Sequence, residues 1–232
     1  MATNNSINNI YRAGRLTGGQ VYTSSTTWSK PAGMKDDDFI LIEGVGGGGG
    51  SNGTPATAST QGAVSGSGAG GGYFFKKILG SALASSETIT IGAGGAAGAP
   101  GGLGAGDGGT TSFGAHASAT GGEAANIGGV VSSNKGTRYI SPSIGGIGAG
   151  GDINITGARS VKGLMFFNEF SIRVFDIRGG GSALSSSHSS RGQSSGGIFP
   201  GGGAYGTSVG GNSAARAGAA GATGMVKIAE YY

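Results

Sequence analysis

The chain of 232 residues has no cysteine, only 5 prolines, and charged residues amount to 11%. The lack of cysteine excludes a disulfide scaffold, a cysteine-ligated zinc site and thiol chemistry. A collagen triple helix needs glycine at every third position and about 15–20% proline, whereas residues 46–50 here are an unbroken glycine run. No apolar stretch reaches the length of about 18 residues that a membrane-spanning helix requires.

Glycine is present in large excess. The chain has 56 glycines, about one residue in four, where ordinary usage is about 7%. Leu, Ile, Val and Phe make up 42 residues, a share of about 18% that lies close to the threshold for disorder. The net charge is only +4, however, and the apolar residues are grouped in short blocks. We therefore expect an ordered chain that folds as one domain.

These blocks predict short β-strands between glycine tracts. Residues 39–42 are apolar on both faces, which predicts a strand buried on both sides, and residues 164–177 are either core or a subunit interface. No long helix is expected, and residues 79–86 allow a turn or two. Strands are expected within residues 21–28, 39–42, 73–79, 88–91, 153–155, 164–177 and 225–229.

The glycine tracts need a conformation of their own, because strands without side chains pack poorly. A three-residue-per-turn helix of the polyproline II type leaves every N–H and C=O free to bond to neighbouring segments. The expected fold is all-β or irregular, with short strands, packed glycine-rich polyproline-II-like rods and little or no helix. Residues 101–107 and 145–152 share a Gly-rich pattern ending in Asp, which fits a rod and turn used twice, or a coincidence.

A glycine-rich chain matches functional motifs by chance. Residues 44–49 fit G-x-G-x-x-G without a surrounding βαβ unit, and no Gly-Lys pair exists for a phosphate-binding loop. Residues 192–196 fit G-x-S-x-G, but both histidines, His116 and His188, precede Ser194. Residues 36–38 are three aspartates, which are typical of a solvated turn. Asp107 and Asp152 follow glycine-rich segments similar to the calcium-binding nonapeptide, but each comes later than the aspartate of that motif. We expect no enzyme activity, cofactor, metal or nucleic-acid partner.

Seven motifs follow one another in a specific order from about Trp28 to the C-terminus. They are Pro-Ala-Gly at 31–33, an apolar strand leading into poly-glycine at 39–50, Ile-Thr-Ile-Gly at 89–92, Gly-Gly-Thr-Thr-Ser-Phe-Gly at 108–114, Ala-Thr-Gly-Gly at 119–122, Gly-Gly-Asp-Ile-Asn-Ile at 150–155 and Val-Lys-Ile-Ala-Glu-Tyr at 226–231. This order resembles the glycine-rich C-terminal domains of tailed-bacteriophage tail fibres and adhesins. The sequence departs from that family at Gly44, where an aromatic is often found.

The resemblance implies a non-enzymatic receptor-binding protein of the phage tail fibre tip that recognises a bacterial surface polysaccharide or protein during host adsorption. Residues 1–20 would be an attachment segment for a tail fibre or baseplate protein, and residues 21–232 the adhesin domain. The alternative is a structural virion component without receptor contact. The start of the chain lacks the features of a secretory signal, which fits a location in the virion tail.

Two segments have bulky or charged residues in place of glycine and are the expected recognition loops. Residues 133–143 contain Lys135, Arg138 and Tyr139, and residues 182–199 contain His188, Arg191 and Phe199. The basic residues suit an anionic glycan or an extracellular protein loop. Because fibres usually have three-fold symmetry, a homotrimer is expected first and a monomer docked on a fibre tip second.

Overall fold

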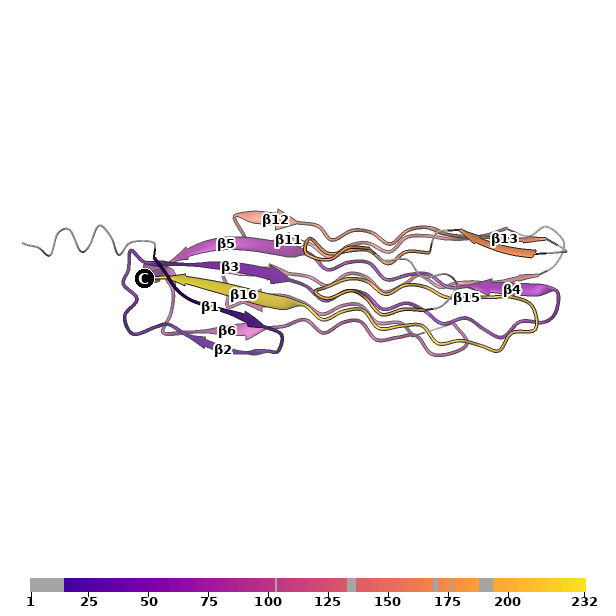
Figure 1. The fold of residues 1–232 in the computed structure, drawn as a ribbon, viewed down its shortest axis with the longest axis horizontal. Coiled ribbons are helices and arrows are strands. Elements are labelled where there is room, and N and C mark those ends of the chain that lie inside the picture. The colour runs from indigo at the N-terminus through magenta and orange to yellow at the C-terminus, as the bar shows by residue number, and fades with distance from the viewer. Residues whose placement is uncertain (1–14, 103, 133–136, 169–170, 176, 188–193) are drawn as a thin grey trace, which may run out of the picture.

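The computed structural model describes residues 15–102, 104–132, 137–168, 171–175, 177–187 and 194–232 (Figure 1). The molecule is elongated, with β-strands at both ends and extended segments running between them. Among these residues the one helical element is the single 3-10 turn η1 (Gly80–Ala82). The expected all-β fold with little helix is confirmed.

The described strands form four antiparallel sheets, which we call sheets A to D. Sheet A has the strand order β1-β16-β3-β5-β12, sheet B β11-β8-β7-β6-β2, sheet C β15-β4-β9 and sheet D β10-β13-β14. The strands are β1 (Leu16–Tyr22), β2 (Thr26–Ser29), β3 (Phe39–Val45), β4 (Gln61–Val64), β5 (Tyr73–Leu79), β6 (Ser86–Thr90), β7 (Thr111–Phe113), β8 (Ala117–Ala119), β9 (Gly129–Ser132), β10 (Thr137–Ile140), β11 (Gly148–Ala149), β12 (Ile153–Ile155), β13 (Gly163–Asn168), β14 (Ser171–Phe175), β15 (Ser208–Val209) and β16 (Met225–Tyr231).

Sheets A and B enclose the main hydrophobic core at one end of the molecule, which we call the sheet end. Alternate side chains of sheet A point inward, and the indole ring of Trp28 from sheet B packs 5.9 Å from the ring of Phe113. The indole N–H of Trp28 donates to Glu230 Oε1 (2.8 Å) and so links β2 to the C-terminal strand. The buried members of this core are Trp28, Met34, Ile40, Ile42, Phe74, Ile78, Leu83, Ile89, Phe113, Ala117, Ala119, Val226 and Ile228.

Beyond β3 the chain continues as a straight glycine rod, residues 46–54, which lies inside a bundle of neighbouring segments. Every third N–H of the rod donates to the same antiparallel neighbour, as a three-residue-per-turn helix requires. The donor–acceptor pairs are Gly46–Gly72 and Gly49–Ala69, Gly47–Gly109 and Gly50–Gly106, and Gly48–Ala222 and Ser51–Ala219, with N···O distances of 2.9–3.0 Å. Three parallel neighbours donate in return, through Gly95 and Gly98, Gly122 and Ala125, and Ala204.

A second rod, residues 65–72, repeats this arrangement beside the first. The carbonyls that accept its N–H groups again recur with a period of three, so each neighbour is met once per turn. The pairs are Ser65–Thr207, Gly68–Ala204 and Gly71–Gly201, then Ala69–Glu123 and Gly72–Thr120, and Gly70–Ala158, at 2.8–3.0 Å. The backbone groups are thus satisfied between rods, which is how this chain buries glycine tracts without side-chain packing.

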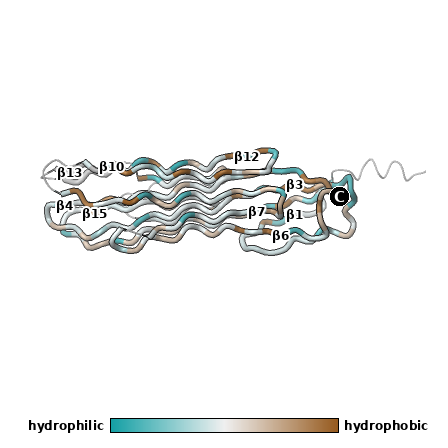
Figure 2. Tube along the Cα trace, turned by 180° about the vertical axis from the view of Figure 1, so that it is seen from behind, coloured by the Kyte–Doolittle hydropathy of each residue, from teal (hydrophilic) through white to brown (hydrophobic). Residues whose placement is uncertain are grey.

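Glycine is required in the rods because neighbouring backbones approach too closely for any side chain. A Cβ on Gly47 or Gly50 would lie closer than 3.0 Å to the carbonyl oxygens of Ala93 and Ala96. Figure 2 shows the consequence along the chain: hydrophobic residues gather in the sheets, and the middle of the molecule is pale. The rods are held by backbone hydrogen bonds.

Sheets C and D lie at the opposite end, which we call the loop end (Figure 1). A small second core sits beneath them and anchors the ends of the rods. Met165 and Ile177 are fully buried in it, so these two residues of the 164–177 segment belong to the core. The whole cluster is Val64, Val131, Ile140, Met165, Ile177 and Tyr205.

Residues 21–28, expected as one strand, are divided between two sheets. Val21 and Tyr22 complete β1, whereas β2 begins at Thr26 and pairs with β6 in sheet B. The chain bends between them, where Ser25 Oγ accepts the N–H of Ile91 (2.9 Å). β1 itself begins at Leu16, within the segment expected to serve attachment.

Of the two alternatives for the repeated pattern, the structure favours coincidence. Gly101, Gly102 and Gly104 have φ of 107°, 104° and 93°, whereas the N–H of Gly146 donates to Gly70 of the second rod. One further expectation is wrong. The segment 39–42 is not buried on both faces, because Ile40 and Ile42 are buried while Phe39 and Leu41 are only half-buried. One face of sheet A is therefore open.

Candidate functional site

The loop end presents an aromatic side chain on an edge strand. β10 is at the edge of sheet D, where Tyr139 pairs with Leu164 of β13. The Tyr139 side chain is 55% exposed, although its neighbour Ile140 is buried in the small core. An exposed tyrosine offers a flat apolar face and a polar tip, which suits recognition of a ligand.

Lys162 lies beside this tyrosine. Its Nζ is 5.2 Å from the centroid of the Tyr139 ring, which is within the range of a cation–π interaction. Lys162 directly precedes β13, the strand that pairs with β10. The two side chains therefore form one unit that combines an aromatic surface with a positive charge.

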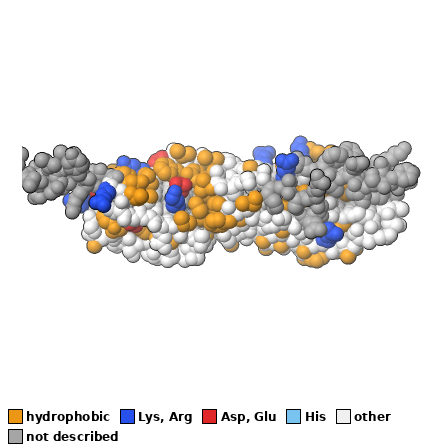
Figure 3. All heavy atoms as spheres, in the orientation of Figure 1, with side chains coloured by type: hydrophobic (Ala, Val, Ile, Leu, Met, Phe, Trp, Pro, Cys, Tyr) orange, Lys and Arg blue, Asp and Glu red, His pale blue; other side chains and the backbone are white. Residues whose placement is uncertain are grey.

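Three further basic side chains among the described residues lie in the same half of the molecule and are exposed. The N–H of Val161 donates to the carbonyl of Arg178 (2.9 Å), which brings Lys162 and Arg178 onto adjacent segments, and Arg216 pairs with Thr54. Figure 3 shows acidic side chains on the face in view only over the sheet end. Among the described residues this half of the molecule attracts anionic groups through Arg159, Lys162, Arg178 and Arg216.

Sequence reasoning missed these four residues, although a signal was available. Between residues 124 and 224 the chain has eight basic residues and only three acidic ones, Asp152, Glu169 and Asp176. Counting charge by segment in place of the whole chain would have indicated a basic end. The structure adds that Asp152 lies at the sheet end, where it accepts the N–H of Lys77.

The predicted loop residues are described only in part. Lys135, His188 and Arg191 lie outside the described residues. The backbone of Arg138 pairs with Met165 in sheet D, but its side chain is not among those that the structure describes. Of the three residues singled out in the first predicted loop, Tyr139 is the one whose side chain is described, and it is exposed.

Phe199 does not share a surface with Tyr139. It is 48% exposed, but it sits at a turn near the start of the rods. A Cβ on the nearby Gly201 would contact Gly46 and Val45, and Ser182 Oγ donates to the carbonyl of Pro200 (2.7 Å). The turn beside Phe199 therefore lies near the end of β3, away from the loop end.

The residues of the chance motifs have structural partners. Asp107 Oδ1 accepts the N–H of Ala124 (2.7 Å), and Ser194 Oγ donates to the carbonyl of Ala217 (3.1 Å). His116 Nε2 lies 3.0 Å from Glu87 Oε1 at the sheet end. Within the described ranges, no three His, Asp or Glu side chains cluster as a metal site would require.

Two tyrosines of sheet A have shifted acidity. Burial and, to a smaller extent, the Glu230 carboxylate raise the pKa of Tyr22 above its ordinary value of 10.0. Burial and then Glu43 raise the pKa of Tyr73 in the same way. Both shifts favour the neutral phenol, as expected for tyrosine side chains packed on a sheet beside a carboxylate.

The glycine rods, the strand order and the closing C-terminal strand describe a glycine-rich domain, and the sequence model of that family matches residues 20–231. The chain belongs to the glycine-rich domain family. The match covers almost the whole glycine-rich domain, from β1 to β16. A search of curated proteins finds none that matches this glycine-rich domain. No helix among its described residues is long and apolar enough to cross a membrane.

Proposed function

We propose that this glycine-rich domain is a non-enzymatic receptor-binding protein at the tip of a bacteriophage tail fibre. The observation that carries the proposal is the rod scaffold. Lateral hydrogen bonds of residues 46–54 and 65–72 hold the loop end apart from the sheet end, where the C-terminus lies (Figure 1). Such a scaffold is stiff, and loops at its end can vary without disturbing the hydrogen bonds that hold it.

The order of the seven sequence motifs, which resembles that of tail fibre domains, supports a phage origin, and the motifs lie at distinct places in the fold. The poly-glycine motif is the central rod, the Ile-Thr-Ile-Gly motif ends β6 of sheet B, and the C-terminal motif is β16 between β1 and β3. A tail fibre adhesin would reside in the virion. It would attach to a tail fibre or baseplate protein at the sheet end, where the chain also enters at Leu16.

The recognition surface in this proposal is the loop end. Tyr139 and Lys162 form its described centre, and Lys135 and Arg138 belong to the same segment of the sequence. The basic side chains favour a receptor with anionic groups, either a surface polysaccharide or an outer-surface protein. Because the Phe199 turn lies elsewhere on the molecule, the segment 182–199, which contains His188, Arg191 and Phe199, is a second candidate for receptor recognition.

The test is whether the isolated protein binds bacteria. Fluorescently labelled protein is titrated onto a panel of whole cells, and purified surface polysaccharide and outer-surface protein fractions are then added as competitors. Saturable binding that one fraction abolishes is the expected result, and the effective fraction identifies the receptor class. A structural virion component gives no saturable binding to any strain, which would overturn the proposal.

A further inference from the structure

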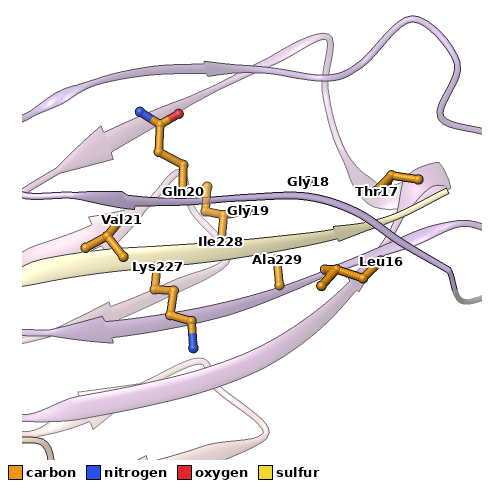
Figure 4. Close-up of a pocket in the computed structure, with 9 residues that line it drawn as sticks. All are labelled: Leu16, Thr17, Gly18, Gly19, Gln20, Val21, Lys227, Ile228 and Ala229. Carbon is orange, nitrogen blue, oxygen red and sulfur yellow. The ribbon is translucent and has the colours of Figure 1, made fainter.

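The outward face of sheet A is an uncovered apolar surface. Strand alternation places its side chains opposite the main core, and Figure 4 shows Val21, Lys227, Ala229 and Leu16 on one side of the ribbon with Ile228 on the other. Its edge members Leu16, Val21, Leu79, Ile153 and Ile155 are 44–59% exposed. We call this surface the open face: Leu16, Gly19, Val21, Phe39, Leu41, Glu43, Tyr73, Phe75, Lys77, Leu79, Ile153, Ile155, Lys227, Ala229 and Tyr231.

The sequence of β3 is typical of a strand that is buried on both faces. In the single chain, only one face of β3 is buried. Phe39-Ile40-Leu41-Ile42 is a continuous apolar run, which is typical of strands buried on both faces. Ile40 and Ile42 are buried in the main core, whereas Phe39 and Leu41 face outward and remain half-buried. Figure 3 shows hydrophobic side chains gathered over this part of the molecule. A contiguous apolar surface of this kind marks an interaction site.

The side chains of the open face are already ordered. The rings of Phe39 and Tyr231 stack with centroids 4.7 Å apart, and Lys77 Nζ lies 3.9 Å from the centroid of Phe39. Lys227 Nζ is 3.4 Å from Glu43 Oε1. Both lysines thus have partners within the face.

The two edges of sheet A differ: a hollow lies along β1, and exposed isoleucines lie on β12. Along β1, where Gly18 and Gly19 provide no side chains, a hollow of about 560 Å³ is lined by β1 and residues 227–229 (Figure 4). At the opposite edge, Ile153 and Ile155 of β12 are both exposed. Between these edges lies β3, the central strand of the five.

We propose that a second copy of this chain covers the open face, related by a two-fold axis that runs parallel to the strands through β3. Such an axis places β1 of one copy over β12 of the other and β16 over β5. One row of paired residues crosses all five strands in the order Val21, Lys227, Glu43, Phe75 and Ile153. The two-fold rotation reverses the order of this row in the second copy. Val21 therefore contacts Ile153 of the partner subunit, and Lys227 contacts Phe75 of the partner subunit.

The neighbouring rows are complementary under the same operation. Leu41 meets its own copy on the axis, and Lys77 meets the partner's Ala229, so the two lysines do not oppose each other. Glu43 faces its copy, with Lys227 at 3.4 Å beside each carboxylate to offset the repulsion. Two sheets that pack with their strands nearly aligned are a common arrangement.

The size of the open face suits such a pair. Five strands about 4.8 Å apart and about 20 Å long give a face of about 400 Å² in projection. Two copies therefore cover about 800 Å² in projection and more in accessible area, near the value of about 1,000 Å² expected for a specific interface. Because the strands run along the molecule, both loop ends then point the same way, which would double the valency of the proposed receptor-binding end.

The first experiment measures the mass of the intact protein in solution by light scattering and sedimentation at micromolar concentrations. A dimer is expected. The double variant Val21→Lys and Ile153→Lys should weaken the dimer by at least about tenfold, because it places lysines on both contacting edges. Ile127→Lys is the control, since Ile127 is exposed outside sheet A and its change should leave the mass unaltered. A monomer or a homotrimer as the native species overturns the pairing.

The second experiment tests the position of the two-fold axis directly. Because the chain has no native cysteine, a cross-linker reacts only with the cysteines that are introduced. A variant with both Val21→Cys and Ile153→Cys is treated with a short bismaleimide at low protein concentration. A covalent dimer is expected from the double variant, and far less from either single variant, because each position meets the other across the interface. Equal cross-linking of the two single variants, or none in the double variant, contradicts this arrangement. Neither result bears on receptor binding, which is measured on cells.

Discussion

The ring of Phe74 fills the space that a side chain at Gly44 would occupy. The two residues pair across β3 and β5, Phe74 is fully buried, and a Cβ on Gly44 would lie closer than 3.0 Å to the ring. The aromatic ring that fills this part of the core therefore comes from the neighbouring strand β5.

Gly44→Ala should destabilise the protein although alanine is the smallest possible change. The added methyl group collides with a buried ring in a packed core, and overpacking of this kind costs about 1–3 kcal/mol. Thermal and urea unfolding measure the loss. Gly33→Ala is the control, because the nearest atoms to a Cβ there belong to Tyr232 at 3.9 Å. Equal stability of the two variants would contradict the packing described.

The same site allows a rescue experiment. Phe74→Gly removes the ring and should cost about 3–5 kcal/mol, as for other large-to-small core changes. Adding Gly44→Phe returns a ring to the same space from the other strand, so the double variant should recover part of the loss. Strictly additive losses would mean that the two positions do not share the space.

Gly47→Ala should be more damaging than Gly44→Ala. Its Cβ would meet the backbone carbonyl of Ala93 closer than 3.0 Å, and a hydrogen-bonded rod cannot move aside as a side chain can. We expect loss of cooperative folding or a fall in stability of more than about 3 kcal/mol. Gly196→Ala is the matched control, because one carbonyl oxygen lies 3.5 Å from its Cβ position. Unfolding by urea distinguishes them, and an unchanged midpoint for Gly47→Ala would contradict the rods.

Slow amide hydrogen exchange is expected in the rods, although they contain no β-strand or α-helix. The N–H groups of residues 46–50 all donate to neighbouring rods, so they exchange only when the bundle opens. Mass spectrometry or NMR should find protection comparable with that of β3 and β16. The exposed turn at Gly33 provides the comparison and should exchange rapidly. Fast exchange at residues 46–50 would mean that these lateral bonds are not stable.

Much of this fold could be predicted from the sequence. Strand blocks at residues 73–79, 153–155 and 225–229 stand out because apolar residues alternate or cluster between glycine tracts. The rods could be predicted because buried backbone groups must be paired. The division of residues 21–28 between two sheets could not, since it depends on Ser25 bonding to Ile91 across the fold. The exposed face of β3 was also not predicted. An apolar run indicates that both faces of a strand become buried, but it does not show whether the same chain or another one buries them.

The candidate site could be predicted less well. Tyr139 was expected from its bulk in a glycine-poor segment, and it is exposed at the loop end. Lys162 was missed because it precedes a strand in sequence and reaches Tyr139 only through the pairing of β10 with β13. In the sequence, Phe199 and Tyr139 have the same appearance: each is an aromatic residue in a predicted loop. Their different locations become evident only from the fold, in which the turn beside Phe199 lies near Gly46.

Stability should fall at alkaline pH through Tyr73. Burial, and then Glu43, raise its folded-state pKa above the ordinary value of 10.0. The neutral phenol is therefore favoured by folding, and its contribution is complete below about pH 10 and lost as the pH rises through the folded pKa. Melting temperatures from about pH 8 to about pH 11 should decline less in Tyr73→Phe than in the wild type. Parallel declines would mean that folding does not change the pKa of Tyr73, which would contradict the raised value in the folded sheet.

The most direct test of the account is cell binding by variants at the two ends of the molecule. Arg138→Ala, Tyr139→Ala and Arg191→Ala are compared with Lys35→Ala and Thr27→Ala, which change exposed residues at the sheet end. Binding of labelled protein to host cells is measured beside the melting temperature of each variant. We expect loss of binding by Arg138→Ala, Tyr139→Ala and Arg191→Ala with unchanged melting, and normal binding by both sheet-end controls. Normal binding by the Arg138 and Tyr139 variants would contradict the loop end as the receptor-binding surface.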